Sequence, residues 1–159
     1  MSSNDEEIEF NSHKWVWIPD KSKTFVKGFV LEDNLDSGTK MKIRTEDDKD
    51  IIVVKDEVEP VNPPRFNSAD DMAELTHLNE PSVLYNLQQR YMNDLIYIYS
   101  GLFLVAVNPY ANVPLYGPDY VDMYNGSNKN DSKPHIFAIT ELTYRYMLEK
   151  QQHQSILVT

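Results

Sequence analysis

This chain of 159 residues is acidic: 25 Asp and Glu against 15 Lys and Arg give a formal net charge of −10. That balance disfavours general binding to nucleic-acid backbones, and the lack of cysteine excludes disulfides; the four scattered histidines show no metal-ligand spacing. The start is unlike a signal peptide and no apolar run approaches the roughly 18 residues of a membrane helix, so we expect a cytoplasmic protein that binds neither nucleic acid nor a membrane.

The first part of the chain is predicted to be a short tail followed by a small β-barrel. Residues 1–11 are polar and acidic and are expected to form a disordered tail. Four short stretches rich in apolar residues follow, and turn residues separate them at the intervals typical of small all-β barrels. The stretches span residues 15–18, 24–31, 40–45 and 50–54. We therefore predict an independently folding SH3-like barrel over residues 12–62.

Alternation along the strands predicts which side chains this barrel buries. Met41 and Ile43 would point inward, between outward-facing basic residues. Trp15 and Trp17 lie two residues apart and so share one face of the first strand. Aromatic residues at strand period are usually buried, so we expect both in the barrel core and in packing against the following region, rather than on a ligand-binding surface.

Residues 63–159 are predicted to form a second region, of mixed α/β type, after a stiff linker at Asn62-Pro63-Pro64. A helix capped by Ser68 comes first, and a second helix begins near Pro81. Their apolar faces would be Met72, Leu75 and Leu78 in the first helix and Val83, Leu84, Leu87 and Tyr91 in the second.

Further elements complete this second region. Residues 95–99 and 102–107 are expected to be a hairpin of two strands, each buried on both faces. A short helix over residues 118–124 and a longer one over 135–152 follow. The apolar run 155–159 after that helix is predicted to be a strand in a buried parallel sheet, as in α/β folds.

Five segments of this chain closely resemble the start of a myosin heavy-chain motor domain. They are 62–66 (NPPRF), 71–84 (DMAELTHLNEPSVL), 95–103 (LIYIYSGLF), 107–110 (VNPY) and 134–139 (PHIFAI). The run 71–84 is most similar to conventional, class II myosins, and the resemblance covers about residues 13–159. It implies an SH3-like subdomain followed by the opening of a motor core of the P-loop NTPase type.

The resemblance also implies which parts of a motor this sequence holds. In the family, residues 154–159 lead directly into the glycine-rich loop that binds the ATP phosphates and Mg²⁺. That loop, the switch loops, the actin-binding surfaces and the lever arm are not in this sequence. The parent would be a coiled-coil, actin-activated Mg-ATPase of the cytoskeleton, with actin filaments and light chains as partners. We expect this piece alone to hold no catalytic residue, to be inactive and to bind neither ATP nor Mg²⁺.

One side of the nucleotide site falls within the chain if the resemblance holds. Asn108, Pro109 and Tyr116 match the family's pattern in the loop after residues 102–107 and would lie on the adenine and sugar side of ATP. An Asn amide offers a donor and an acceptor to a base edge, and a tyrosine offers a flat face and a hydroxyl. Myosins commonly carry Lys or Arg directly after the Asn-Pro-aromatic triplet, and Ala111 at that position argues against a cationic contact to the base.

Two other functions are compatible with the sequence. The SH3-like barrel could be a protein-interaction module, with the rest of the chain as a helical platform. Alternatively, a cut motor piece would hide its open sheet edges by self-association, for example by exchanging its C-terminal helix and strand. The sequence that follows Thr159 in the gene product would decide for the motor if it contained a phosphate-binding loop.

Overall fold

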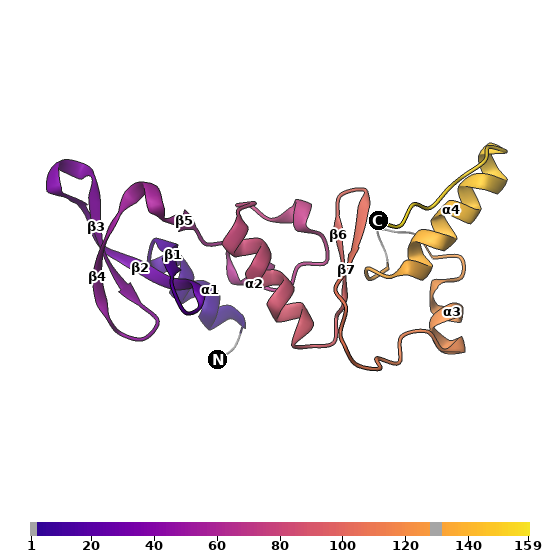
Figure 1. The fold of residues 1–159 in the computed structure, drawn as a ribbon, viewed down its shortest axis with the longest axis horizontal. Coiled ribbons are helices and arrows are strands. Elements are labelled where there is room, and N and C mark those ends of the chain that lie inside the picture. The colour runs from indigo at the N-terminus through magenta and orange to yellow at the C-terminus, as the bar shows by residue number, and fades with distance from the viewer. Residues whose placement is uncertain (1–2, 128–131) are drawn as a thin grey trace. The chain divides into compact units, whose positions relative to one another are not determined.

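The computed structural model describes residues 3–127 and 132–159, which fold into two compact units (Figure 1). Unit 1 comprises Met1–Ala69 and Glu74–Gln88, and unit 2 comprises Asp70–Ala73 and Gln89–Thr159. Helix α2 (Glu80–Tyr91) therefore begins in unit 1 and ends in unit 2. Residues 74–88 are thus grouped with residues 1–69 in unit 1. No helix in the described part of the chain is long and apolar enough to cross a membrane.

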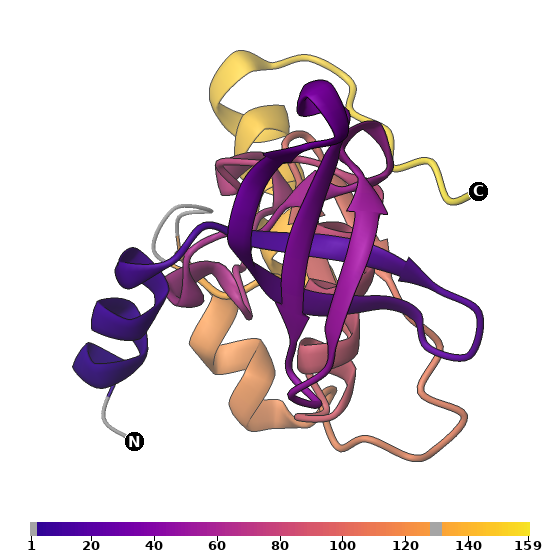
Figure 2. The ribbon, with the colours of Figure 1, turned by 90° about the vertical axis from the view of Figure 1, so that its left-hand side faces the viewer.

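Unit 1 is built on a five-stranded antiparallel sheet with the strand order β4-β3-β2-β1-β5, as an SH3-like barrel requires (Figure 2). The strands are β1 (Trp15–Asp20), β2 (Thr24–Leu35), β3 (Lys40–Thr45), β4 (Asp50–Val54) and β5 (Glu59–Pro60). All four predicted strands are present. Two register shifts against β3 interrupt the long strand β2, and such bulges let one strand bend around a barrel.

The barrel core confirms the alternation predicted for β3. Met41 and Ile43 are buried together with Val16 and Ile18 of β1. At Gly28 the backbone of β2 lies very close to β3. A Cβ atom at this position would lie 2.7 Å from Ile43 Cγ2 and 2.8 Å from the Arg44 carbonyl oxygen. A larger residue at Gly28 would separate β2 from β3.

The two tryptophans face away from this core, so their predicted place inside the barrel was wrong. They occupy the opposite face of β1 from Val16 and Ile18. Trp17 is buried against α2: its indole N–H donates to Ser82 Oγ at 3.2 Å, and its ring centroid lies 5.2 Å from that of Tyr85. The packing predicted against the following region is therefore present for Trp17.

A helix replaces most of the predicted disordered tail. Helix α1 spans Ser3–Ser12, and residues 1–2 lie outside the described residues. The helix packs on the short 3₁₀ turn η3 (Pro64–Phe66), with Phe10 half-buried and Glu7 3.8 Å from Arg65. Composition alone predicted disorder because it does not show that residues 64–66 offer this tail a surface to pack on.

The first helix predicted for the second region is also absent. Only the 3₁₀ turn η4 (Met72–Glu74) forms there. The Asp71 carboxylate accepts hydrogen bonds from the backbone N–H groups of Ala73 and Gly101, and the Asp70 carbonyl accepts one from the N–H of Tyr99. These bonds attach the segment to strand β6 (Tyr97–Ser100), so tertiary contacts override the local helix signal.

Helix α2 begins where predicted but buries a different face. The side chains of Ser82, Asn86 and Arg90, spaced four residues apart, form a buried polar stripe, while Leu84 and Tyr91 are exposed. Of the predicted apolar face, Val83 and Leu87 are half-buried, so the pattern was wrong only for Leu84 and Tyr91. The Asn86 amide nitrogen donates to the Phe66 carbonyl at 3.0 Å, while its side-chain oxygen is buried without a partner among the described residues.

Unit 2 contains the predicted hairpin and the last two helices. Strand β6 pairs with β7 (Phe103–Ala106) through a turn at Gly101 and Leu102, and α3 (Pro118–Tyr124) and α4 (Ile136–Lys150) follow. Burial on both faces holds for β6 but not for β7, where Phe103 is 73% exposed.

The strand predicted at residues 155–159 does not form. Residues 151–159 have no regular secondary structure and are exposed. A parallel strand needs a neighbour to supply its hydrogen bonds, and the sheet formed by the described residues of unit 2 consists of β6 and β7, paired with each other.

Candidate functional site

The loop of residues 107–117 connects β7 to α3 and carries all three predicted site residues. It begins with a hydrogen bond of 2.9 Å from the Val107 N–H to the Ile96 carbonyl, which extends the hairpin. The Asn108 side-chain oxygen then accepts from the Tyr110 N–H at 2.9 Å, so Asn108 caps its own turn. Tyr110 adopts a positive φ of 49° and is exposed. The turn fixes the orientation of the Asn108 amide at the surface.

Three side chains from three different elements hold this loop. The Tyr91 hydroxyl of α2 donates to the Pro109 carbonyl at 3.0 Å. The hydroxyls of Tyr97 in β6 and Tyr116 lie 2.7 Å apart and share a hydrogen bond. His135, just before α4, places its Nε2 3.0 Å from the Leu115 carbonyl. Tyr91 therefore holds the start of the loop, and Tyr97 and His135 hold its end. Asn108 and Tyr116 remain accessible to solvent.

His135 is the centre of an aromatic cluster beneath the end of the loop. Its side chain is only 2% exposed. The surrounding rings are those of Tyr97, Tyr116, Tyr120, Tyr124 and Phe137, with the Tyr124 ring stacked at 4.8 Å and 18°. Packing against this many rings fixes the orientation of the imidazole.

Hydrogen bonds determine the protonation of His135. Nδ1 accepts from the Phe137 N–H at 3.0 Å and so caps the start of α4. Because Nδ1 accepts, the proton of the neutral ring is on Nε2, which donates to the Leu115 carbonyl. Burial lowers the pKa of His135, and this effect outweighs the hydrogen bond to Leu115, which raises it. The ring is therefore neutral at pH 7.

Tyr97 and Arg90 form the hydrogen-bonded support next to the loop of residues 107–117. Burial, followed by the hydrogen bond with Tyr116, raises the pKa of Tyr97 far above its ordinary value, so the Tyr97 hydroxyl stays protonated. Arg90 is 3% exposed and donates from Nε and Nη2 to the Tyr97 carbonyl at 3.1 and 2.6 Å. Its Nη1 lies 2.6 Å from the Asp70 carboxylate. The guanidinium thus joins the end of α2 to the start of β6.

The predicted site residues differ in how the structure holds them. Asn108 is exposed at the start of the loop, Pro109 is half-buried under Tyr91, and Tyr116 is 53% exposed at the far end. Sequence reasoning missed Tyr91, Tyr97 and His135, since a lone tyrosine or histidine carries no spacing signal. Among residues 3–127 and 132–159, no group of His, Asp or Glu side chains could hold a metal ion.

Comparison with known proteins identifies the family. Residues 2–62 match the myosin N-terminal SH3-like domain, and residues 69–159 match the myosin head (motor domain). Two Schizosaccharomyces pombe proteins are similar: myosin type-2 heavy chain 2 is 50% identical over 97% of this chain, and myosin type-2 heavy chain 1 is 48% identical over 95%. The chain spans only 7% and 10% of these relatives' own lengths. The class II resemblance is confirmed, and the chain belongs to the myosin family.

Proposed function

We propose that this chain supplies the adenine side of the ATP site in an actin-based, ATP-hydrolysing myosin motor. The observation that carries the proposal is the loop of residues 107–117, anchored by Tyr91, Tyr97 and His135 while Asn108 and Tyr116 stay accessible. A loop held at both ends can present side chains to a ligand with little ordering on binding.

Each predicted residue has a role that its environment allows. Asn108 directs its amide to a base edge, and its self-capped turn limits the orientations of that amide. Tyr116 offers a ring face beside the sugar, with its hydroxyl held by Tyr97. Pro109 keeps the backbone between them rigid. Ala111 adds no charge, so adenine recognition here relies on neutral contacts.

The phosphates and Mg²⁺ would be bound by other parts of the motor. The sequence contains no glycine-rich phosphate-binding motif, and no described cluster of carboxylates could hold the metal. ATP, when bound, supplies the phosphoryl bond whose hydrolysis drives a motor. We propose that residues 1–159 alone have no ATPase activity. Actin filaments and light chains are the proposed partners of the whole heavy chain, and the cytoplasmic cytoskeleton is its proposed location.

Base selectivity in a motor that contains this chain tests the adenine role. Asn108→Ala should lower kcat/KM for ATP about tenfold relative to GTP, since a neutral contact to the base contributes about 1 kcal/mol or slightly more. Tyr116→Ala removes a contact beside the sugar, which both nucleotides share, and should lower kcat/KM for both. Steady-state ATPase and GTPase assays measure the two kcat/KM values and their ratio. Asp122→Ala, at an exposed position in α3, is the matched control and should leave it unchanged. An unchanged ratio in Asn108→Ala would refute the proposal.

A further inference from the structure

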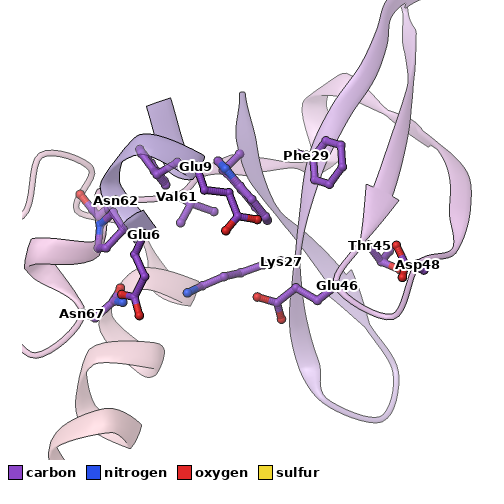
Figure 3. Close-up of a pocket in the computed structure, with 13 residues that line it drawn as sticks. Glu6, Glu9, Lys27, Phe29, Thr45, Glu46, Asp48, Val61, Asn62 and Asn67 are labelled. Atoms are coloured by element: carbon purple, nitrogen blue, oxygen red, sulfur yellow. The ribbon is translucent and has the colours of Figure 1, made fainter. Parts of the chain in front are cut away.

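Unit 1 contains a hollow of about 370 Å³ between helix α1 and the barrel (Figure 3). Its lining comes from α1, β1, β2, the turn after β3 and the segment that follows β5. All of these belong to unit 1, so the hollow is complete without any residue of the nucleotide-side loop. Nothing in the motor reaction described above uses it.

Aromatic rings form the walls of this hollow. Phe10 contributes from α1, Trp15 from β1 and Phe29 from β2, and the Trp15 and Phe29 rings meet edge to face at 5.3 Å and 63°. The indole nitrogen of Trp15 is buried and has no hydrogen-bond partner among the described residues. A buried donor without an acceptor is costly and uncommon in native proteins. The rings, rather than this enclosed nitrogen, are what the wall offers a ligand.

Carboxylates surround the opening. In Figure 3, Glu6 and Glu9 extend from α1 toward the hollow, and Glu46 faces it from the turn after β3. None of these three carboxylates forms an ion pair within residues 3–127 and 132–159. Their neighbour Glu7 behaves differently, because it lies 3.8 Å from Arg65. Three acidic side chains thus remain available at one opening.

The single basic residue of the lining does not neutralise this rim. The Lys27 ammonium lies 3.6 Å from the ring centroid of Tyr85 and 5.2 Å from that of Trp17. These cation–π contacts hold its charge toward α2. With Asp48 included, the lining carries four carboxylates and one ammonium.

We propose that this hollow docks a basic segment of a partner protein, with one Arg or Lys side chain inserted among the rings. Aromatic faces and carboxylates both favour a cation, and together they favour one on a partly apolar stem. Charge complementarity with the acidic rim is the ground for a basic peptide, and competition by spermine distinguishes it from a free polyamine. The proposal does not depend on the nucleotide role of unit 2.

The test uses the 159-residue chain and a short fluorescein-labelled peptide of alternating arginine and serine, followed by fluorescence anisotropy. A variant with Glu6→Gln, Glu9→Gln and Glu46→Gln should weaken binding about tenfold, because each exposed charge pair contributes a few tenths of a kcal/mol to about 1 kcal/mol. The matched control is Glu32→Gln, Glu57→Gln and Glu59→Gln: it removes the same charge at exposed positions of unit 1 outside the hollow and should change affinity less than about twofold.

Other arms of the experiment define the ligand. A peptide with citrulline in place of arginine should bind weakly. Spermine should displace the labelled peptide poorly when it is added at the same concentration of positive charge. Circular dichroism melts confirm that both triple variants stay folded. Absence of peptide binding, equal weakening in the two triple variants, equal binding of the citrulline peptide, or effective competition by spermine would each overturn the proposal.

Discussion

At the scale of single residues, His135 has the most consequences. One imidazole caps α4, holds the Leu115 carbonyl and fills an aromatic cluster. Histidine is not a preferred cap, so no pattern of residues predicts this role for His135. Met41 and Ile43, in contrast, follow strand alternation and were predicted correctly, because burial in a strand depends on a local period.

Protonation of His135 should destabilise the chain. Its folded-state pKa lies below the ordinary value of 6.5. The unfolded chain therefore binds more protons between the two pKa values, and stability is complete above pH 6.5 and falls as the pH drops toward the folded pKa. Titration by NMR should show His135 changing charge at a pH below the ordinary pKa of 6.5.

A variant separates the destabilisation caused by His135 protonation from the loss of stability that other groups cause at low pH. His135→Asn keeps a capping side chain but loses the bond to Leu115, and it should remove much of the loss of stability below pH 6.5 in urea unfolding. His153→Asn should leave that loss in place. A His135 that titrated at or above pH 6.5 would contradict the neutral, buried assignment.

At the scale of elements, α2 shows where pattern reasoning fails. Its apolar positions predicted one face, but Ser82, Asn86 and Arg90 are buried because Trp17, Phe66 and Tyr97 offer them hydrogen-bond partners. Such partners lie far apart in sequence, so no local pattern reveals them. The same limit explains the lost helix at residues 72–74, where contacts with β6 determine the structure.

Removing Arg90 should weaken the junction of α2 and β6. Arg90→Leu leaves the Tyr97 carbonyl without its donor, at a cost of roughly 1–3 kcal/mol. Asp70 is half exposed, so water compensates for most of the lost ion pair. Gln88→Leu, at an exposed position of the same helix, should change stability by less than about 0.5 kcal/mol. Urea unfolding of both variants measures the difference, and equal values would contradict a structural role for Arg90.

At the scale of the whole molecule, exposed apolar side chains predict association. Leu102 and Phe103 at the hairpin are 91% and 73% exposed, and Leu157 and Val158 are both 85% exposed. Such surfaces, next to an open strand edge, favour contact with another chain. The SH3-like barrel and the mixed α/β class were predictable, because both follow from strand spacing and motif order. The conformation of residues 155–159 could not be predicted from the local sequence, since a strand forms only where a neighbouring strand exists.

Sedimentation at several concentrations tests self-association. The chain should form dimers or larger species, and Phe103→Glu in β7 should shift it toward monomer. Ile52→Glu, at an exposed apolar position of β4 in unit 1, is the matched control and should not. A monomer at every concentration would refute the prediction, and equal shifts in both variants would show that the hairpin is not the contact.

The distribution of aromatic residues provides an optical label for each half of the chain. Trp15 and Trp17 both belong to unit 1, whereas every tyrosine except Tyr85 lies in unit 2. Light that excites only indole therefore follows unit 1, and the phenol absorbance follows mainly unit 2. A denaturation experiment on the unmodified chain can therefore follow the two units by separate spectroscopic signals, with no dye attached. The two curves show whether the units unfold in one step or in sequence.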